Sequence, residues 1–576
     1  MTRTDTLVVG TLVVLLALVA GLVGVPAIMP TAAPGSPTPS EPVAARPYRE
    51  GVLGVATSVS PLTARSQADR DLVALVFSGL VRNGPGGTLV PDLAERWSTD
   101  ASGKVWVFEL RRDARWHDGE PVTAEDVAYT IRTLQDPAYR GPAASSWREV
   151  TVRATSMYTV TFTLATPLGG FLQAATQPLA PAHILGDVPV DLLADHPFGQ
   201  APVGTGPFAL VSLDETSAVL APASTVMPVD APSADPSARP TDSLTTPAPT
   251  ERPSRPLPYL PGLEFRFFDD PSALGAAYER GDLDVASGLP PASAVELATG
   301  PGSRLLRYPG ATLTAVLFNL RPDHPTFRDA AVRTALFGAI DREALIAEAY
   351  SGAAAMASGP IPAASPWFDA AAEPAVKYDR SAAIKALRKA GWKDDDDGWR
   401  PKGAKKPLEL EVLSPDEASS PAVHAAAARV VADWKRLGLA VKHTALPAAE
   451  FVGDHVRNGK YDVVVADLAL GLDPDLYPLL ASSQTLTGGS NVMGIQDPAL
   501  DRLLAAARAP GSPEARTAAY KALQVQLGKG HYLLPLAFAD EATVARNTLQ
   551  GPVTRLVADP ADRFWDVLTW RLADDR

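Results

Sequence analysis

The alternation of strand-like and helix-like segments constrains the fold of this chain more than any single motif. Residues 105–110 form a short run rich in aromatic and β-branched side chains, which indicates a strand. Residues 123–134 carry apolar side chains at helical spacing. Thr123 can cap this helix, and Asp126 stands at its third helical position. Residues 158–164 again alternate like a strand.

The same patterns recur in the second half of the chain. They predict a pair of helices within 329–350, a helix at 422–437, a strand that begins at Leu439 and a strand at 461–468. Gly438 directly follows one helix and is expected to end it. The strand at 461–468 is apolar almost throughout, which favours burial of both its faces. Such alternation predicts α/β lobes. Because 576 residues exceed what one hydrophobic core normally holds, at least two domains are expected.

The N-terminus carries a continuous run of apolar and small residues over 7–25, and no charged residue lies between Asp5 and Glu41. About 20 apolar residues cross a bilayer as a helix, whereas a secretory signal core spans about 7–15. A retained signal anchor over 1–29 is therefore favoured, and a cleaved signal peptide is the alternative. The expected location is the extracytoplasmic face of the cell membrane, tethered by this helix, or outside the cell after cleavage.

Two segments have the composition of unstructured chain. Residues 30–47 are rich in Pro, Ser and Ala and predict a disordered tether. Residues 222–261 are dense in Pro, Ser, Thr and Asp and predict a disordered surface insertion. A passive spacer is the favoured interpretation of this insertion, and a flexible tether for a partner is the other.

Composition excludes several classes of function. The net charge of −13 disfavours nucleic acid as a partner. The chain has no cysteine, which removes disulfides, cysteine-based metal sites and the acylated cysteine that anchors a bacterial lipoprotein. The eight histidines form no HExxH motif or close pair, and no Gly-x-Ser-x-Gly elbow occurs. We therefore expect no catalytic residue, no metal site and no cofactor.

A block of motifs spans residues 89–134. It contains a Leu93-Ala94-Glu95-x-Trp97 turn, a Gly103-Lys104 pair before an aromatic strand, the Trp116-His117-Asp118-Gly119 turn and an Ala124-Glu125-Asp126-Val127 helix start. Matches that follow in order are Val203 to Phe208, Phe318-Asn319, Arg333, Asp341-Arg342, Tyr461-Asp462 and Asp473-Pro474. Together these residues resemble the extracellular solute-binding proteins of family 5, the peptide- and nickel-binding type, over about residues 48–570.

The resemblance implies a type II periplasmic-binding-protein fold with two lobes and an extra subdomain, preceded by the N-terminal transmembrane or signal helix. The implied boundaries are 47–82, 203–311 and 532–576 for lobe I, 83–202 for the extra subdomain and 312–531 for lobe II. Lobes of this kind close on a ligand like a hinged trap.

The resemblance also implies a ligand site between the lobes. Residues 204–208 and 316–319 would line its base, and the loop at 467–475 would reach in from lobe II. The candidate ligand-binding residues are Gly204, Thr205, Gly206, Phe208, Asn319, Asp467 and Asp473. The Gly204-Thr205-Gly206 run lacks the spacing of a phosphate-binding loop, so a hinge with close backbone approach is its favoured interpretation.

This chain differs from the peptide-binding members of the family at one position that determines which class of ligand is bound. In peptide-binding relatives an Asp shortly before the Asp-Pro pair holds the ammonium group of the peptide, and a gapless match places Leu470 there. Leucine cannot neutralise a buried ammonium. Asp467 or Asp473 could replace it only if the loop is shifted, and Asp473 could equally serve as a turn residue. A neutral or differently charged solute becomes a stronger candidate than a peptide with a free N-terminus.

These observations predict a monomeric receptor that is not an enzyme. It would capture a small solute, peptide-like or other, and present it to the permease of an ABC importer. The alternative is a membrane-tethered ligand-binding or sensory module without a transport role, which the missing lipoprotein cysteine and the 222–261 insertion motivate. Neighbouring permease and ATPase genes would distinguish the two. A secreted hydrolase has only chain size and the implied cleft in its favour.

Overall fold

The computed structural model describes residues 46–141, 147, 149–223, 257–395, 398–485 and 489–573. The expected N-terminal helix, nearly all of the tether and most of the 222–261 insertion lie outside these residues. Residues Arg46–Arg576 form one compact unit. In the part of the chain that the structure describes, no helix has both the length and the apolar character needed to cross a membrane.

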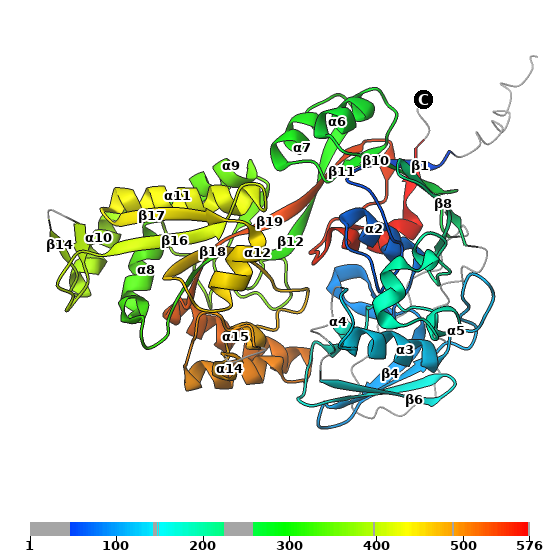
Figure 1. Ribbon diagram of the computed structural model, residues 1–576, viewed down its shortest axis with the longest axis horizontal. Helices are drawn as coiled ribbons and strands as arrows, with labels where there is room; N and C mark the ends of the chain where they lie inside the picture. Colours follow the sequence, from blue (N-terminus) through cyan, green and yellow to red (C-terminus); the bar gives the residue numbers. More distant parts are fainter. Residues whose placement is uncertain are drawn as a thin grey trace, which may run out of the picture. The chain divides into compact units, whose positions relative to one another are not determined.

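An eleven-stranded mixed sheet runs through this unit, in the order β17-β16-β18-β12-β19-β11-β1-β10-β9-β8 with β13 paired to β19 (Figure 1). Parallel pairs join β1 to β10 and β11, and β16 to β17 and β18, whereas β12 and β19 are antiparallel. The strand bounds are β1 Tyr48–Leu53, β8 Phe208–Leu213, β9 Ser217–Pro222, β10 Leu263–Phe268, β11 Val285–Ser287, β12 Ser303–Phe318, β13 Ala354–Met356, β16 Glu409–Pro415, β17 Ala440–Leu446, β18 Val463–Ala469 and β19 Leu533–Arg546.

A separate four-stranded antiparallel sheet has the order β4-β5-β7-β6, and three two-stranded sheets complete the strands of the described residues. The bounds are β2 Val81–Asn83, β3 Leu89–Pro91, β4 Ala94–Thr99, β5 Val105–Leu110, β6 Val150–Ser156, β7 Thr159–Leu164, β14 Lys393–Asp395, β15 Gly398–Arg400, β20 Leu549–Gln550 and β21 Arg571–Leu572.

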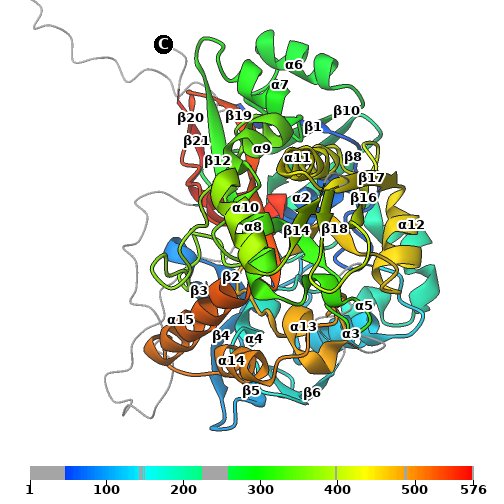
Figure 2. The same cartoon turned by 90° about the vertical axis from the view of Figure 1, so that its left-hand side faces the viewer.

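Helices cover these sheets, with α8 packed on α10 and α9 on α11 (Figure 2). The α-helices are α2 Gln67–Val76, α3 Ala124–Gln135, α4 Phe171–Ala174, α5 Ala182–Leu185, α6 Pro271–Glu279, α7 Pro291–Leu297, α8 Ala330–Gly338, α9 Arg342–Tyr350, α10 Arg380–Lys389, α11 Pro421–Leu437, α12 Ala448–Glu450, α13 Tyr477–Leu480, α14 Pro498–Arg508 and α15 Pro513–Gly530. Short helical turns are η1 Pro85–Gly87, η3 Val190–Asp195, η4 Pro197–Gly199, η5 Pro325–Phe327, η6 Phe451–Val456, η7 Ser482–Gln484 and η8 Pro560–Thr569.

The predicted elements are confirmed, with shifts of one or two residues at their ends. The strand at 105–110 is β5, and α3 begins directly after Thr123, its predicted cap, which forms a capping box with Asp126 at the third helical position. The helix α11 ends at Leu437, and Gly438 adopts a φ of 100°, the left-handed conformation that ends a helix. The mixed α/β character follows from this alternation.

Buried apolar side chains form two large clusters. One contains residues between 313 and 538, and the other contains residues between 48 and 265 together with 285 and 545–570. The long strands β12 and β19 enter both regions. The register of the pair shifts between Pro309 and Leu313, and a side chain at Gly310 would overlap the carbonyl of Ala539. The two strands therefore change from one core to the other at an irregular, tightly packed point.

Candidate ligand-binding site

A cavity of about 640 Å³ lies beside α2. Every described residue that lines it comes from residues 61–207, from Leu257 or from 555–568. Its walls include one face of α2 and the residue that caps its end (Arg70, Val73, Ala74, Phe77), parts of β2 and β3 with the residue that follows (Val81, Arg82, Asn83, Pro91, Asp92), the end of α4 (Gln173, Ala174), and η8 with its neighbours (Asp559, Ala561, Asp562, Phe564, Trp565). This volume falls within the range of about 300–1,000 Å³ that small-molecule sites occupy.

Aromatic side chains form much of the apolar wall. Phe77, Trp147, Phe564 and Trp565 all line the cavity. Trp147 is held in place by Phe171, whose ring lies at a centroid distance of 5.8 Å. Rigid rings of this kind offer large contact areas at little cost in conformational entropy. The wall can therefore hold an apolar or aromatic part of a solute.

Charged groups of both signs also face the cavity. Burial raises the pKa of the Asp92 carboxyl to about 6, and the nearby guanidinium groups of Arg82 and Arg111 oppose that shift. Arg111 pairs with Asp113 at 3.2 Å and Arg70 with Asp559 at 2.7 Å. Cavity-lining arginines outnumber aspartates by five to three among the described residues, although the chain as a whole is acidic. The cavity can therefore pair with acidic and basic groups of a solute.

Arg555 is the least satisfied of these arginines. Its Nε and Nη2 atoms are buried and have no hydrogen-bond partner within the described chain. Its Nη1 donates to the carbonyl of Gly84 at 3.5 Å, and the guanidinium lies 4.9 Å from the ring centre of Trp565. Burial lowers the pKa of Arg555. The side chain packs mainly as a flat surface against the indole.

Thr205 and Gly206 are the two predicted ligand residues that line this cavity. The amide of Gly206 donates to the carbonyl of Val76 at 2.8 Å, and a side chain at Gly206 would place its Cβ 2.6 Å from the carbonyl oxygen of Leu75. On the other side, the Nε2 atom of His117 lies 3.0 Å from the carbonyl oxygen of Gly206. The predicted close backbone approach is confirmed, whereas the predicted ligand contact of Gly204, Thr205 and Gly206 stays a prediction.

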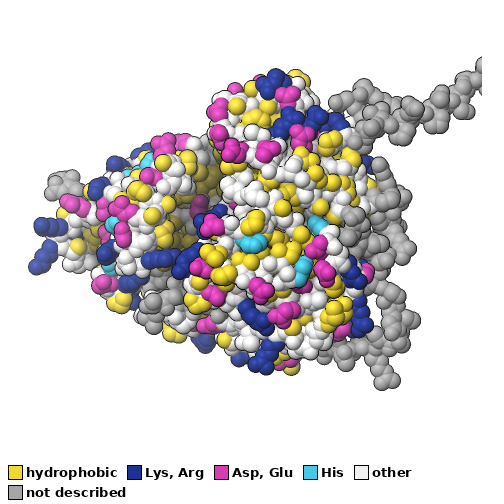
Figure 3. All heavy atoms as spheres, turned by 45° about the vertical axis from the view of Figure 1, so that its right-hand side comes forward, with side chains coloured by type: hydrophobic (Ala, Val, Ile, Leu, Met, Phe, Trp, Pro, Cys, Tyr) yellow, Lys and Arg dark blue, Asp and Glu magenta, His cyan; other side chains and the backbone are white. Residues whose placement is uncertain are grey.

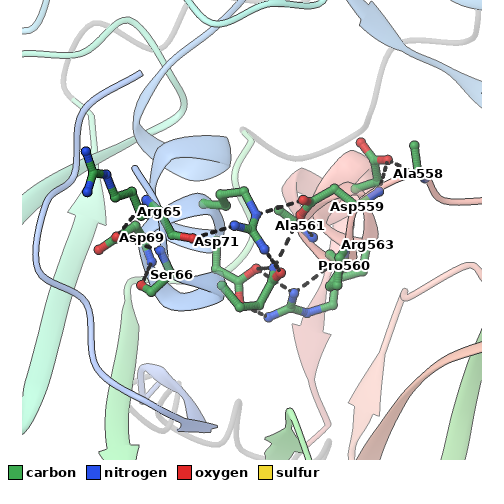
Figure 4. Close-up of polar contacts among 12 residues, drawn as sticks. Arg65, Ser66, Asp69, Asp71, Ala558, Asp559, Pro560, Ala561 and Arg563 are labelled. Atoms are coloured by element: carbon green, nitrogen blue, oxygen red, sulfur yellow. Dashed lines mark hydrogen bonds and ion pairs between the residues drawn. The ribbon is translucent and has the colours of Figure 1, made fainter. Parts of the chain in front are cut away.

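A buried polar network borders the cavity between α2 and η8 (Figure 4). The Arg563 guanidinium donates to Asp71 at 2.6 and 2.8 Å and to Glu50 at 2.8 Å. Next to this group, Gln67 donates to Asp71 at 2.7 Å and to Asp559 at 3.3 Å. The network fixes the start of α2 against η8, so the cavity has a rigid edge.

Three other predicted site residues, Asp467, Asn319 and Phe208, do not line the cavity, and the first two have internal hydrogen-bond partners. Thr314 donates to the Asp467 carboxylate at 2.5 Å, and burial raises the pKa of Asp467. Asn319 is fully buried, and its side-chain Nδ2 donates to the carbonyls of Gly459 and Tyr461 at 3.1 and 3.0 Å. Phe208 is a buried core residue of the cluster that contains residue 48. Their contact with a ligand stays a prediction.

Asp473 accepts hydrogen bonds from Arg516 at 2.9 Å and from the Tyr520 hydroxyl at 3.0 Å. It also faces Gly170 on the loop before α4. Leu470 packs on the core that contains residue 313, and its amide donates to the carbonyl of Ala311 at 3.2 Å. The structure thus leaves the Leu470 position without a carboxylate.

Sequence analysis missed the cavity residues Arg82, Asp92, Trp147 and Arg555. Arg82 precedes the block of motifs at 89–134, and Asp92 lies in that block directly before Leu93 but is not one of its motif residues. Arg555 lies far along the chain in an irregular segment. Neither periodicity nor motif spacing marks these positions. Their shared wall exists only because α2, β2 and η8 meet in three dimensions.

The mixed α/β fold and the cavity beside α2 define a solute-binding protein. A model of the bacterial extracellular solute-binding proteins, family 5, matches residues 88–491. Protein XP55 of Streptomyces lividans is 30% identical over 513 residues, which cover 88% of this chain and 86% of XP55. The oligopeptide-binding protein AppA of Bacillus subtilis is 24% identical over 462 residues, 79% of each chain. The chain belongs to the bacterial extracellular solute-binding proteins of family 5.

Among solved structures, NikZ of Campylobacter jejuni in complex with Ni(L-His) superposes with a TM-score of 0.65 at 25% identity and covers 91% of this chain and 99% of NikZ. The predicted family and the predicted role as substrate-binding receptor of an importer are confirmed. Members of the family are extracytoplasmic transport proteins and not enzymes.

Proposed function

We propose that this receptor holds a small solute in the cavity beside α2 and presents it to a membrane permease without transforming it. The observation that carries this proposal is the cavity of about 640 Å³, with aromatic walls and a few charged groups. The surface seen in Figure 3 has a hollow with acidic and basic side chains at its rim. Acting as a monomer, the receptor would work at the outer face of the membrane.

The lining supports a solute that carries both an apolar part and ionic groups. Asp92 can accept from an amine, and Arg82 and Arg111 can donate to a carboxylate. The Bacillus subtilis relative binds oligopeptides and the Campylobacter jejuni neighbour holds Ni(L-His), so both accept molecules that contain amino acids. A peptide-like solute fits this chemistry, but its ammonium group would be held by Asp92 and not at Leu470.

Two lobes with boundaries at 47–82, 203–311 and 532–576, and at 312–531, remain our proposal for the moving parts. The strands β12 and β19 contribute to both apolar clusters, which supports a hinge at their shifted register near Gly310. The described residues that line the cavity all belong to the first lobe or to residues 83–202. Closure around such a hinge would therefore dock the 312–531 lobe against residues 83–202, where Gly169 already contacts Arg508, and would not wrap that lobe around the cavity itself.

Native mass spectrometry of the full-length chain, purified in mild detergent without refolding, tests the proposal. We expect a bound molecule of defined mass, which denaturing analysis would identify. The variant Ala174→Phe places a ring in the cavity wall and should abolish the bound mass. Ala518→Phe, on an exposed face of α15, is the matched control and should retain it. A bound mass that survives in Ala174→Phe would show that the solute is held elsewhere.

A further inference from the structure

A glycine-lined contact joins the loop before α4 to two segments of the other core. The amide of Gly169 donates to the carbonyl of Arg508 at 2.8 Å. A side chain at Gly170 would place its Cβ 2.8 Å from Cγ of Asp473, and one at Gly169 would place its Cβ 3.0 Å from the carbonyl oxygen of Ala509. Only a surface without side chains can approach this closely.

The two sides of this contact belong to different apolar clusters. Phe171, directly after the glycine pair, is buried in the cluster that contains residue 48. Ala507 and Tyr520, on either side of the α14–α15 turn, are buried in the cluster that contains residue 313. Since β12 and β19 join these clusters at an irregular point, rotation of one core about that point would break the contact at Gly169 and Gly170.

Asp473 is held rigidly on its own side. Nη2 of Arg516 lies 2.9 Å from both carboxylate oxygens, and the Tyr520 hydroxyl donates to the carboxylate at 3.0 Å. The Arg516 guanidinium in turn lies 4.4 Å from the ring centre of Trp367. The carboxylate therefore presents a fixed surface to Gly170 and does not need to be ordered when the contact forms.

The contact also adjoins the cavity. Gly170 directly precedes α4 as its N-cap residue, and Gln173 and Ala174 in that helix line the cavity. We propose that Gly169, Gly170 and Asp473 form a closure latch, which holds the cavity-lining helix α4 in place and sets how long the two lobes stay closed. This inference rests on the proposed receptor function and assigns Asp473 a positioning role in place of ligand contact.

The variant Gly170→Ala tests the latch. The φ of −84° at Gly170 suits alanine, so the added methyl group meets an obstacle only where Asp473 approaches. Gly275→Ala is the matched control, because nothing lies within 4 Å of a Cβ at that helical position. An overlap of this size should lower the ratio of closed to open molecules by about tenfold.

The absence of native cysteine allows the ratio to be measured directly. Spin labels at Ala101→Cys and Ala518→Cys, two exposed positions on opposite sides of the contact, report the separation in the full-length chain by pulsed electron resonance. We expect a short distance between the labels in the parent and in the control Gly275→Ala. In Gly170→Ala a larger share of the molecules should show a long distance. Identical distance distributions in all three proteins would overturn the proposal.

A second substitution identifies the obstacle. Combining Gly170→Ala with Asp473→Ser removes most of the side chain that the new methyl group meets, and serine still accepts a hydrogen bond. The short distance should return in this double variant, and its failure to return would exclude Asp473 as the partner of Gly170. The distance measurement requires no solute, so it tests the latch separately from solute capture. If the distances confirm the latch but native mass spectrometry finds no bound molecule, only the receptor proposal is refuted.

Discussion

Arg563 and Arg333 are both buried, and the two regions that hold them satisfy the charge in different ways. Arg563 in η8 meets two carboxylates, Asp71 at 2.6 Å and Glu50 at 2.8 Å, and all three residues are at most 4% exposed. Arg333 in α8 is equally buried but has no carboxylate partner in the described chain. It donates to the backbone carbonyls of Phe327, Arg328, Gly530 and His531.

The difference follows from what lies nearby in each region. Gly530 and Phe327 end α15 and η5, and carbonyls at such ends lack intrahelical partners and carry partial negative charge. Burial lowers the pKa of Arg333 to about 10. At Arg563 burial acts in the same direction, but the carboxylates of Asp71 and Glu50 raise the pKa well above its ordinary value. Carboxylate partners thus join distant segments around a buried arginine at a high desolvation cost. Carbonyls at helix ends can also satisfy a buried arginine, without burying a second charged group.

The variant Arg563→Met should have the largest effect, because it leaves Glu50 and Asp71 buried without their cation. We expect a loss of about 4 kcal/mol in the free energy of unfolding, measured by urea denaturation at neutral pH. Arg571→Met, at an exposed position in β21, is the control and should change stability by less than about 0.5 kcal/mol. Equal stability of Arg563→Met and the parent would show that the paired centre contributes nothing.

The variant Arg333→Met should cost less, about 2–3 kcal/mol, because it leaves carbonyls without donors but no unpaired ionised group. Arg333→Lys separates charge from geometry. Lysine keeps the charge, yet its single ammonium cannot reach carbonyls on two sides as the guanidinium does. We expect Arg333→Lys to lose nearly as much stability as Arg333→Met in the same urea assay. If Arg333→Lys were as stable as the parent, the positive charge alone would explain the contribution of Arg333 to stability.

The sequence predicted the local structure around these regions and not the contacts that join them. The capping box of Thr123 and Asp126 and the helix end at Gly438 use residues close in sequence, so their chemistry is visible in a few letters. Arg563 lies 492 residues from Asp71, and no periodicity indicates that pairing.

The candidate site was even less predictable. The resemblance directed attention to Asp467 and Asp473, but each binds a neighbour that only the fold supplies. The cavity wall combines α2, β2 and η8, which no motif connects. The close backbone approach at Gly206 was predictable, because such an approach requires a glycine and a glycine is visible in the sequence.

His531 gives a pH-dependent measure of the uncompensated charge at Arg333. Burial is the largest cause that lowers the pKa of His531 from 6.5 to about 4, and repulsion from Arg333 and Arg342 adds to it. Between these values the unfolded chain binds a proton that the folded chain does not, so stability falls as the pH drops from 6.5 through 4. We expect about 2 kcal/mol from this group, because partial exposure reduces the full linkage value.

Hydrogen–deuterium exchange at the imidazole carbon, followed by mass spectrometry, measures the pKa of His531 in the intact chain. Arg333→Met should raise this pKa towards its ordinary value, whereas Arg563→Met should leave it unchanged because Arg563 is not among the groups that affect His531. A pKa that stays near 4 in Arg333→Met would mean that burial and Arg342 control it without a contribution from Arg333.

The variant Tyr48→Phe should have the smallest effect, about 1 kcal/mol in the free energy of unfolding. The Tyr48 hydroxyl donates to Glu50 at 2.6 Å, and burial raises its pKa, so it remains a neutral donor. The ring stays packed edge-on against Trp570 at 5.8 Å in either variant. Only one hydrogen bond is lost, since Arg563 continues to satisfy Glu50.

Combining Tyr48→Phe with each arginine variant sharpens the comparison between the two charge centres. Tyr48 and Arg563 share Glu50, so the losses in Tyr48→Phe with Arg563→Met should depart from additivity by more than about 0.5 kcal/mol. Tyr48 and Arg333 share no partner, so those two losses should add. Additivity in both pairs would show that Glu50 responds to each neighbour independently, and the first centre would then act as separate contacts and not as a coupled network.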